Sequence, residues 1–566
     1  MSERTFWQLL GGVFLVYLAG MRVNVMDVDA AQYAAMSREM LESGSYLQVF
    51  EQGHDYLDKP PLLFWLSSSC MKFLGVNNFA YKFPSLIFAL LAIFSTHRFT
   101  ELFYNKTTAQ LAALVLATSQ ALFLITNDCR ADTLLMGCVA FTFWQLSAAF
   151  LTDKWQHFLL GFVGIGVGLL AKGPVALIIP ALGFTAHFIW KKDFKQFLRV
   201  EYLWGLVVIG VILLPMIWGL YQQFDLHPEK IIDGKTGVSG LRFFFWTQSF
   251  GRITGENTWN NNAGFGFLFQ NMLWSFAPWI LYLVAGIIAS ILNAFKKTQL
   301  IENQEFITTG GVILGYLSLA ASKYQLPHYI FVVYPLAAVI TARFLHAILY
   351  KNEENKESNE DAENSEDEKN SESESVLVGK ILNSVQWILI TILWGLPATV
   401  LIFVFPAQGI PLAVTGILVT ILVISAFQKK SILFSSIYTA LIINLFLNIF
   451  FYPTLLKYQY GSEVGKKIRL ENVANDKFFT FKYQPTSSLH FYSRRIVQVK
   501  ENVEEVKPDD WLLTDEKGLQ VLQDEGLELD FKETGNTFPV TNLNSTFLYA
   551  KTRSEVVGQY FLVVVK

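Results

Sequence analysis

Long apolar segments recur along most of the chain, and they constrain the fold more than any other feature. Each has about the length that an α-helix needs to cross a bilayer, roughly 20 residues. Since 52% of the 566 residues are hydrophobic, which is more than a soluble core could bury, we expect a polytopic α-helical membrane protein. Hydropathy predicts about 13 transmembrane helices, near residues 5–22, 83–103, 107–126, 133–151, 156–171, 174–190, 201–221, 269–293, 306–322, 327–349, 378–403, 409–427 and 431–452.

Charge and cysteine content exclude several classes of function. The formal net charge of -3 gives no reason to expect a nucleic-acid partner. Cys70, Cys129 and Cys138 have neither paired nor metal-ligand spacing, so cysteine chemistry is not expected. The segment 6–21 lacks a small-residue cleavage site after it, and we interpret it as a retained first span.

The basic loops predict the topology. With a cytoplasmic N-terminus, the loops rich in Lys and Arg fall on the cytoplasmic side provided that segment 61–75 does not cross the membrane. We therefore predict that 61–75 is an amphipathic helix at the outer interface, with Leu62, Leu66, Phe73 and Leu74 toward lipid. The outer side then holds a 23–82 loop with juxtamembrane helices and a 222–268 loop.

Two segments are too polar to lie in the membrane. Residues 351–376 are charged and serine-rich, which predicts a disordered acidic cytoplasmic linker. From residue 453 to 566, short β-type runs such as 488–499, 545–551 and 559–566 alternate with helix-compatible segments such as 516–526. We expect a membrane-embedded domain over 1–452 and a small extracytoplasmic α/β or α+β domain over 453–566.

Charged residues gather on the predicted outer face, where charge beside a bilayer is costly and indicates function. They come from six separate outer segments, as expected of a cavity assembled between helices. The candidates are Asp27, Asp29, Asp58, Lys59, Arg130, Asp132, Lys172, Arg252, Lys323 and His328.

Asp29 begins the predicted amphipathic helix "DAAQYAAMSREMLESG", which carries Tyr33 on its apolar stripe. One interpretation is that Asp29 caps this helix, with Gln32 completing a capping-box-like pair. The other is a carboxylate at the lip of the cavity that orients or deprotonates an attacking hydroxyl. The sequence pattern leaves both open.

Lys59 stands in "YLDKPPLLFW", directly before two prolines. It is either an interfacial lysine beside a proline-initiated helix or a cation for a phosphate group, helped by Arg130 or Arg252. Asp58 is either the salt-bridge partner of Lys59 or a ligand of a divalent metal ion. No spacing of His, Cys, Asp or Glu here is a strong metal signature.

Three further outer segments have two interpretations each. In "CRADTLL", Arg130 and Asp132 either form an ion pair at a helix end or face the cavity, and in "LLAKGPVALIIP" Lys172 either caps a turn or binds an anionic substrate. The 222–268 loop is rich in Gly, Asn, Phe and Trp, which suits a mobile outer loop that orders over a lipid-linked substrate and equally suits a plain interfacial loop.

In these motifs the chain resembles the bacterial polyprenyl-phosphate-sugar-dependent glycosyltransferases, which include the aminoarabinose transferase of lipid A and relatives of the protein O-mannosyltransferases. The resemblance covers about residues 5–345. It rests on the ordered series "DAAQYAAMSREMLESG", "YLDKPPLLFWL", "CRADTLL", "LAKGPVALIIP" and "SKYQLPHYIFVVYPLAAV". It implies a membrane-embedded C-class glycosyltransferase fold.

The resemblance also implies roles for single residues. Asp29 matches an acidic residue regarded as catalytic, and Lys59 matches the Lys-Pro-Pro lysine that faces the polyprenyl phosphate. Tyr329 and Arg252 are implied near the same phosphate, and Asp132 near the cavity. Two departures bear on the metal and acceptor type: Ala30 stands where many members have glutamate, and Asp58 where close relatives have it.

The expected function is an inverting glycosyltransferase that moves a sugar from a polyprenyl-phosphate donor to lipid A, a glycan or a protein at the outer face of the cytoplasmic membrane. Lys59, Arg252 and Tyr329 are expected to bind the donor phosphate and Asp29 to be catalytic. Tyr33, Asp58, Arg130, Asp132, Lys172, Lys323 and His328 are expected around them. A flippase, or a ligase for whole lipid-linked glycans, is the alternative.

Overall fold

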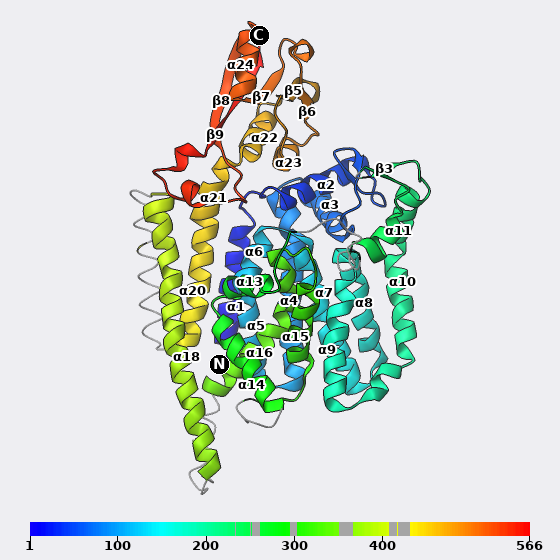
Figure 1. The fold of residues 1–566 in the computed structure, drawn as a ribbon, viewed down its shortest axis with the longest axis vertical. Helices are drawn as coiled ribbons and strands as arrows, with labels where there is room; N and C mark the ends of the chain where they lie inside the picture. Colours follow the sequence, from blue (N-terminus) through cyan, green and yellow to red (C-terminus); the bar gives the residue numbers. More distant parts are fainter. Residues whose placement is uncertain are drawn as a thin grey trace.

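The structure is a computed structural model, and it describes residues 1–232, 234–248, 251, 261–294, 301, 303–349, 366–406, 416 and 431–566, with backbone alone over 366–378. A tall bundle of helices carries a small domain at one end, and the N-terminus lies toward the other end (Figure 1). The bundle helices are α1 (Glu3–Gly20), α4 (Asn78–Phe103), α5 (Lys106–Ala117), α6 (Gln120–Asn127), α7 (Ala131–Thr152), α8 (Trp155–Lys172), α9 (Val175–Lys191), α10 (Glu201–Leu220), α13 (Phe267–Ser275), α14 (Ile280–Ala294), α15 (Ile307–Ala320), α16 (Tyr334–Leu349), α18 (Glu366–Thr399) and α20 (Ile432–Phe446).

Shorter elements join or extend these helices. At the end of the bundle nearest the small domain lie α2 (Asp29–Ser43), α3 (Leu62–Leu74), α11 (Gly240–Arg242) and the two-stranded pairs β1 (Phe50–Glu51) with β2 (His54–Asp55) and β3 (Ile231–Ile232) with β4 (Lys235–Thr236). Single turns continue the helices or connect them: η1 (Phe194–Leu198), η2 (Tyr221–Asp225), η3 (Phe243–Thr247), η4 (Pro327–Val333), η5 (Val400–Val404), η6 (Leu447–Phe451), α21 (Tyr452–Leu455) and η7 (Leu456–Tyr458).

Many of the helices have the length and composition of membrane spans. Within the described part of the chain, seven are long and apolar enough to cross a bilayer, or eight if the bent pair α5–α6 counts as one span. Four more apolar helices are shorter, among them α9, α14 and α15. The predicted span 409–427 lies outside the described residues except for residue 416, so the count of thirteen stays a prediction.

The predicted span 107–126 is bent by 50° between α5 and α6. Two hydroxyl side chains satisfy backbone carbonyls at the break: Thr118 Oγ1 donates to Leu114 O at 2.6 Å, and Ser119 Oγ donates to Leu116 O at 2.8 Å. Trp279 Nε1 in turn donates to Thr118 Oγ1 at 3.0 Å. A break at membrane depth needs such partners, because lipid offers none to the backbone.

Helix α3 covers most of the predicted interfacial segment 61–75. Phe73 and Leu74 are exposed, as expected of residues that face lipid. The prediction was wrong for Leu62, which is buried, because the first turn of α3 packs against α2 and α4. Only the far end of the helix presents an apolar surface.

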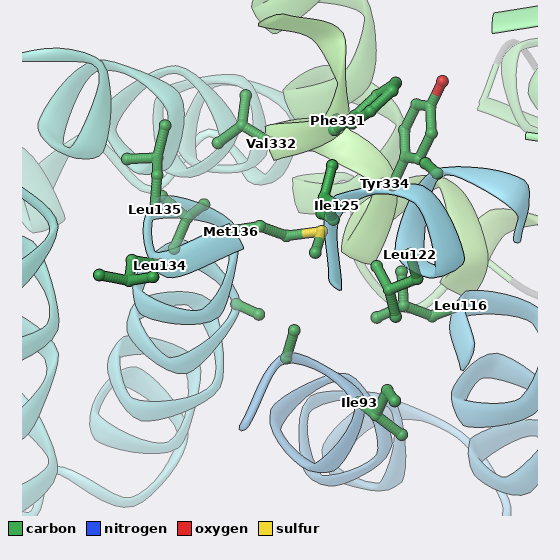
Figure 2. Close-up of a cluster of buried hydrophobic side chains, with 14 of the residues drawn as sticks. Ile93, Leu116, Leu122, Ile125, Leu134, Leu135, Met136, Phe331, Val332 and Tyr334 are labelled. Carbon is green, nitrogen blue, oxygen red and sulfur yellow. The ribbon is translucent and has the colours of Figure 1, made fainter. Parts of the chain in front are cut away.

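The bundle core contains a cluster of apolar side chains from α4, α5, α6, α7 and η4–α16 (Figure 2). Met136 of α7 points toward Ile125 of α6, and Phe331 and Val332 approach the same cluster from η4. These side chains are almost completely excluded from solvent. Their close packing holds α7 in place. Leu135, which belongs to the same cluster, also lines the cavity described below.

The C-terminal domain is an α/β sandwich around a five-stranded sheet of order β6-β5-β7-β9-β8. Strand β5 is parallel to β6 and β7, whereas β9 is antiparallel to β7 and β8. Helices α22 and α23 pack on one face and α24 on the other, each over its own apolar cluster. Its elements are α22 (Tyr460–Leu470), η8 (Asn475–Lys477), β5 (Phe478–Phe481), α23 (Ser487–Ser493), β6 (Gln498–Lys500), η9 (Val503–Glu505), β7 (Trp511–Asp515), α24 (Glu516–Asp524), β8 (Leu529–Thr537), α25 (Ser545–Leu548), η10 (Arg553–Glu555) and β9 (Gly558–Val565).

Two of the predicted β-type runs differ in the structure. The first part of the run 488–499 forms α23, because Thr486 caps the first turn by accepting from Leu489 N and because Leu489 and Tyr492 lie one helical turn apart and are both buried. Only the end of that run, from Gln498, is a strand, β6. Residues 545–548 form the turn α25 behind the cap Asn544. The predicted strand 559–566 and helix 516–526 are confirmed as β9 and α24.

Two boundaries differ from the predictions. The predicted linker 351–376 lies mostly outside the described residues, and its last part, from Glu366, is the beginning of α18. Acidic residues favour the first turns of a helix, so this stretch suits a helix start. The predicted domain boundary at 452 falls within a helical run that continues from α20 to Tyr458.

The domain contacts the bundle at two places. Helix α23 packs on α2, and residues 538–557 pack on the ends of α18 and α20. In the second contact Ala550 N donates to Phe403 O at 2.9 Å, and the Arg553 guanidinium lies 4.5 Å from the Phe405 ring. The domain therefore lies directly over the end of the bundle that holds α2 and α3 (Figure 1).

Candidate active site

A cavity of about 410 Å³ opens where the segment before α3 meets the ends of α7, α8 and α15. Its walls are mostly apolar and include Leu135 of α7, Ile178 and Ile179 of α9, and Leu319 of α15. Its polar lining consists mainly of Lys59, Asp132, Lys172, Gln248, Ser322 and Tyr329. These residues are far apart in the sequence. They meet because the helix starts, helix ends and loops that carry them lie at the same end of the bundle.

Asp132 lies on the cavity wall in the first turn of α7 and is buried. Its Oδ1 forms an ion pair with Lys172 Nζ, at the end of α8. His328 Nε2 lies 3.6 Å from Asp132 Oδ2, and Lys172 Nζ lies 4.3 Å from the centre of the Tyr329 ring. The ion-pair interpretation of Arg130 with Asp132 is wrong, because Arg130 pairs with Asp29 and Asp128 whereas Asp132 pairs with Lys172.

Lys59 lines the same cavity just before α3. Its ammonium group pairs with the carboxylate of Asp58, and both side chains are about one-fifth to one-quarter exposed, at 20% and 24%. Gln248 Nε2 donates to the backbone oxygen of Asp58 and lies 3.3 Å from Asp58 Oδ1. Lys59 is thus a cation held at a cavity wall by a carboxylate behind it, and not a lysine that extends into solvent.

Asp29 pairs with Arg130 across 101 residues of sequence, with Arg130 Nη1 2.5 Å from Asp29 Oδ2. Arg130 Nε also donates to Asp128 Oδ2 at 2.7 Å. The capping interpretation of Asp29 is wrong: the residue at the N-cap of α2 is Val28, and Gln32 donates to Glu51 instead. Asp29 Oδ1 makes no hydrogen bond within the described residues, and the side chain is 38% exposed.

Tyr33 connects the two groups. It is buried on α2 with its ring 5.8 Å from that of Phe64. Burial raises the pKa of Tyr33 well above its usual value, and the nearby Tyr56, Asp29 and Asp58 raise it further. The charges of Asp29 and Asp58 both act on the Tyr33 hydroxyl, so Asp29 and the Asp58–Lys59 pair lie around this common side chain.

The charges of Asp132, Lys172, Arg130 and Lys59 all act on His328, so this side chain likewise lies among the charged groups of the cavity. The predicted cluster is therefore largely assembled. Three of the candidates are not part of it: Lys323 is exposed and does not line the cavity, Asp27 pairs with Ser488 of the C-terminal domain, and Arg252 lies outside the described residues.

Three residues of this region were missed from the sequence. Asp128 holds Arg130 from the second side, Gln248 contacts Asp58 and lines the cavity, and Tyr56 is buried beside Phe64. Asp128 stands in the same short stretch as Arg130, and this proximity was an available signal. Gln248 carried none, because a single amide in a long loop has no pattern.

The residues present do not fit a metal ion. No group of three His, Cys, Asp or Glu side chains that could hold one occurs in the part of the chain that the structure describes. The carboxylate of Asp58 is already taken by Lys59 and Gln248. The metal-ligand interpretation of Asp58 therefore finds no partner ligands here.

The arrangement suits the binding of one anion beside an apolar chain. Lys59 and Lys172 place positive charge at the cavity wall, Tyr329 adds a phenol, and the aliphatic side chains of α9 and α15 form the rest. Asp29 does not line the cavity itself, and its carboxylate has one oxygen held by Arg130 and the other without a hydrogen bond among the described residues. A cation for a leaving anion and a carboxylate for an incoming hydroxyl are the two elements that group transfer needs.

The sequence is similar to known transferases. Residues 58–218 match the family described as dolichyl-phosphate-mannose-protein mannosyltransferase. The chain is 25% identical over 342 residues to the undecaprenyl phosphate-alpha-4-amino-4-deoxy-L-arabinose arabinosyl transferase of Enterobacter sp. (strain 638), covering 59% of this chain and 58% of the relative. The protein of the same name from Edwardsiella ictaluri is 25% identical over 365 residues, covering 62% and 61%. The match thus spans about three-fifths of these relatives.

The fold is similar to that of solved membrane proteins. ArnT from Cupriavidus metallidurans bound to undecaprenyl phosphate superposes with a TM-score of 0.70 at 14% identity, covering 100% of this chain and 98% of that one. The apo form gives 0.68 at 15% identity, covering 94% and 97%. The predicted multi-pass fold with a C-terminal α/β domain and the resemblance to lipid-linked-sugar glycosyltransferases are both confirmed.

Proposed function

We propose that this protein is an inverting glycosyltransferase that takes a sugar from a polyprenyl-phosphate donor and transfers it to an acceptor in the cell envelope. The carrying observation is the cavity in which Lys59, backed by Asp58, shares one mostly apolar wall with Tyr329. A site of this kind suits a phosphate joined to a hydrocarbon chain. The names of the relatives favour undecaprenyl phosphate-aminoarabinose as donor. Lipid A as acceptor follows only from the resemblance of the sequence motifs to the glycosyltransferase family named above.

The mechanism is a single displacement at the anomeric carbon. The acceptor oxygen forms a bond to that carbon while the bond from the carbon to the donor phosphate oxygen breaks, and its electron pair stays on the phosphate. Lys59 stabilises the charge of the departing phosphate, with Tyr329 and, from the sequence alone, Arg252. Asp29, oriented by Arg130, accepts the proton of an acceptor hydroxyl through its open Oδ1.

Asp132 and Lys172 have a supporting role in this proposal. Their ion pair lies on the cavity wall beside His328. Both side chains can turn a polar atom toward a sugar hydroxyl while keeping their mutual contact. We assign them to the binding of the sugar.

The proposed location is the outer face of the cytoplasmic membrane. The distribution of basic loops puts the N-terminus in the cytoplasm. In the structure α2, α3 and the C-terminal domain lie at the end of the bundle away from the N-terminus, which supports a cavity and a domain outside (Figure 1).

A flippase is the second candidate, and the observations favour it less. Transport predicts a cavity that connects both faces through polar residues at mid-depth. The polar lining of the cavity comes from one end of the bundle, and the residues that follow Asp132 along α7, from Leu134 to Met136, belong to the apolar cluster of Figure 2. A ligase that moves whole glycans uses the same chemistry and differs from the proposal in the size of the group transferred.

The testing experiment is transfer of radiolabelled sugar from synthetic polyprenyl-phosphate donors to cell-envelope extracts by the purified protein. We expect Lys59→Ala to lower the rate about 100-fold, as expected from the loss of a charge-stabilising donor. The matched control is Lys72→Ala, an exposed lysine in the last turn of α3.

The label identifies the acceptor by the fraction in which it appears. Wild-type activity in both lysine variants contradicts the assignment of Lys59. Absence of transfer from any donor, together with movement of glycolipid across liposomes that contain the protein, supports the flippase instead.

A further inference from the structure

The connection between α1 and α2, residues 23–28, leads directly into Asp29, and the C-terminal domain holds its backbone. Gln459 contacts it twice: its Nε2 donates to Val25 O at 2.9 Å, and its Oε1 accepts from Asp27 N at 2.8 Å. Val25 N donates to the hydroxyl of Tyr492 at 2.7 Å. Two side chains of the domain therefore pair with backbone groups that lie close to the proposed catalytic residue.

The side chain of Asp27 is held as well. Ser488 N donates to Asp27 Oδ1 at 2.9 Å, and Ser488 Oγ donates to Asp27 Oδ2 at 2.6 Å. Ser488 is completely buried. Burial raises the pKa of Asp27 while the bonds from Ser488 lower it, and the residue as a whole is partly buried. A carboxylate with both oxygens hydrogen-bonded to a buried residue restrains the chain at this point.

The first turn of α2 has no comparable support of its own. Its N-cap residue, Val28, makes no side-chain capping bond and is 60% exposed. Only Val28 lies between Asp27 and Asp29, so the two Cα atoms are at most about 7 Å apart. The place of the Asp29 carboxylate is thus set by two contacts from outside the helix, Arg130 on one side and the domain, through Asp27, on the other.

We propose that Ser488 and Gln459 of the C-terminal domain are positioning residues for Asp29, and that the domain acts on catalysis through Asp27. This inference rests on the proposed transferase. A shift of about 1 Å in a reacting group can lower a rate by as much as about 100-fold. Neither residue contacts the cavity, so donor binding by Lys59 and Tyr329 does not depend on them.

The test compares kcat and the KM for the donor in three variants of the full chain. Asp27→Ala removes both contacts with Ser488, and we expect kcat to fall about 10-fold or more with KM changed less than twofold. Ser488→Ala removes only the hydroxyl, and a fall of about threefold is expected. Asp27→Asn keeps an acceptor for Ser488 N and a polar partner for its hydroxyl, and we expect most of the wild-type kcat.

The control is Arg494→Gln, in the same domain and at the same interface. Arg494 Nη2 donates to Val76 O at 2.8 Å, between α3 and α4, and Arg494 makes no contact with residues 23–29 among the interactions of the described residues. It reports what a general weakening of the interface does. A fall in kcat equal to that of Asp27→Ala overturns the inference, as does a wild-type kcat in Asp27→Ala.

A second readout does not depend on activity. Hydrogen–deuterium exchange over residues 24–33 is expected to be faster in Asp27→Ala than in the wild type and in Arg494→Gln. If the wild type transfers no sugar, the proposed function fails while this exchange still tests the tether. Unchanged exchange overturns the tether whatever the protein catalyses.

Discussion

The two ends of α15 and α16 carry charged clusters of opposite character. At one end the helices border the cavity, through Ser322 and Tyr329. At the other end Glu305 and Arg343 lie almost completely buried, 3.6 Å apart. Arg343 is fourteen residues beyond Tyr329, or about 21 Å along a helix.

The cluster around Glu305, the inner cluster, is buried, and its carboxylate has several partners in the protein. Glu305 accepts from Tyr104 Oη at 3.1 Å, from Thr308 Oγ1 at 2.6 Å and from Thr308 N at 2.8 Å, and the guanidinium of Arg343 lies 5.1 Å from the Tyr104 ring. In the other cluster, Lys59, Asp132 and Lys172 line a cavity. Charge at a membrane face therefore indicates chemistry only where a cavity adjoins it.

The comparison predicts its largest effect at Asp29. Asp29→Asn keeps the shape but removes the base, and we expect kcat to fall about 100- to 10,000-fold because that is the usual contribution of general-base help. The melting temperature is expected to stay near the wild-type value, since Asp29 is partly exposed. A variant that loses its fold along with its activity breaks the comparison, because Asp29 would then resemble the inner cluster.

Glu305→Gln is the complementary change. It leaves the Arg343 cation buried without its carboxylate, which costs about 3–5 kcal/mol of stability in comparable cases. The measurement is thermal unfolding in detergent, with transfer activity determined on the folded fraction. Activity per folded molecule is expected to be unchanged, and a specific loss of kcat would mean that the two ends are coupled.

Acid is expected to weaken the contact between α23 and α2 through His490 of α23, which is buried beside α2. Burial, with help from Arg38, lowers the pKa of His490 to about 4. The unfolded chain therefore binds the extra proton between pH 6.5 and 4, so the stabilising contribution is full above pH 6.5 and is lost as the pH falls toward 4. The loss is about 3 kcal/mol over that range.

Unfolding of the C-terminal domain as a function of pH measures this effect. His490→Asn keeps an acceptor for Val497 N, which donates to His490 Nδ1 at 3.0 Å, and it does not titrate. We expect the pH dependence between 6.5 and 4 to flatten in that variant. A slope identical to the wild type assigns the acid sensitivity to another group.

The smallest effect is expected at Gln248. Gln248→Ala removes its contact with Asp58 but leaves the ion pair of Asp58 with Lys59. We expect the donor KM to rise about threefold to tenfold, as for the loss of one hydrogen bond in a binding site. An effect as large as that of Lys59→Ala would show that Gln248 itself holds the donor.

Sequence reasoning predicted best what depends on local composition. The apolar segments, the helix at Asp29 and the strand β9 follow from residues that are neighbours in the chain. The candidate residues on the outer face also came together, because helices of membrane-spanning length return to the same face. Lys59, Asp132, Lys172 and Tyr329 line one cavity for this reason.

Partners were harder to predict than positions. Arg130 could pair with Asp132, two residues away, but it pairs with Asp29 and Asp128, and Lys172 takes Asp132. The choice depends on which side of α7 each element approaches, which no local pattern encodes. The same limit applies to α23, where burial against α2 and α22 favours a helix in a segment of strand-like composition.

The size of the cavity has a consequence for the lipid. Its volume of about 410 Å³ is near the lower end for small-molecule pockets, which span roughly 300–1,000 Å³. A space of this size has room for the head of the proposed donor but not for a whole long prenyl chain, so in the proposed reaction most of the chain would lie in the bilayer. We therefore expect truncated carriers that still partition into the membrane to serve as well as the full-length lipid.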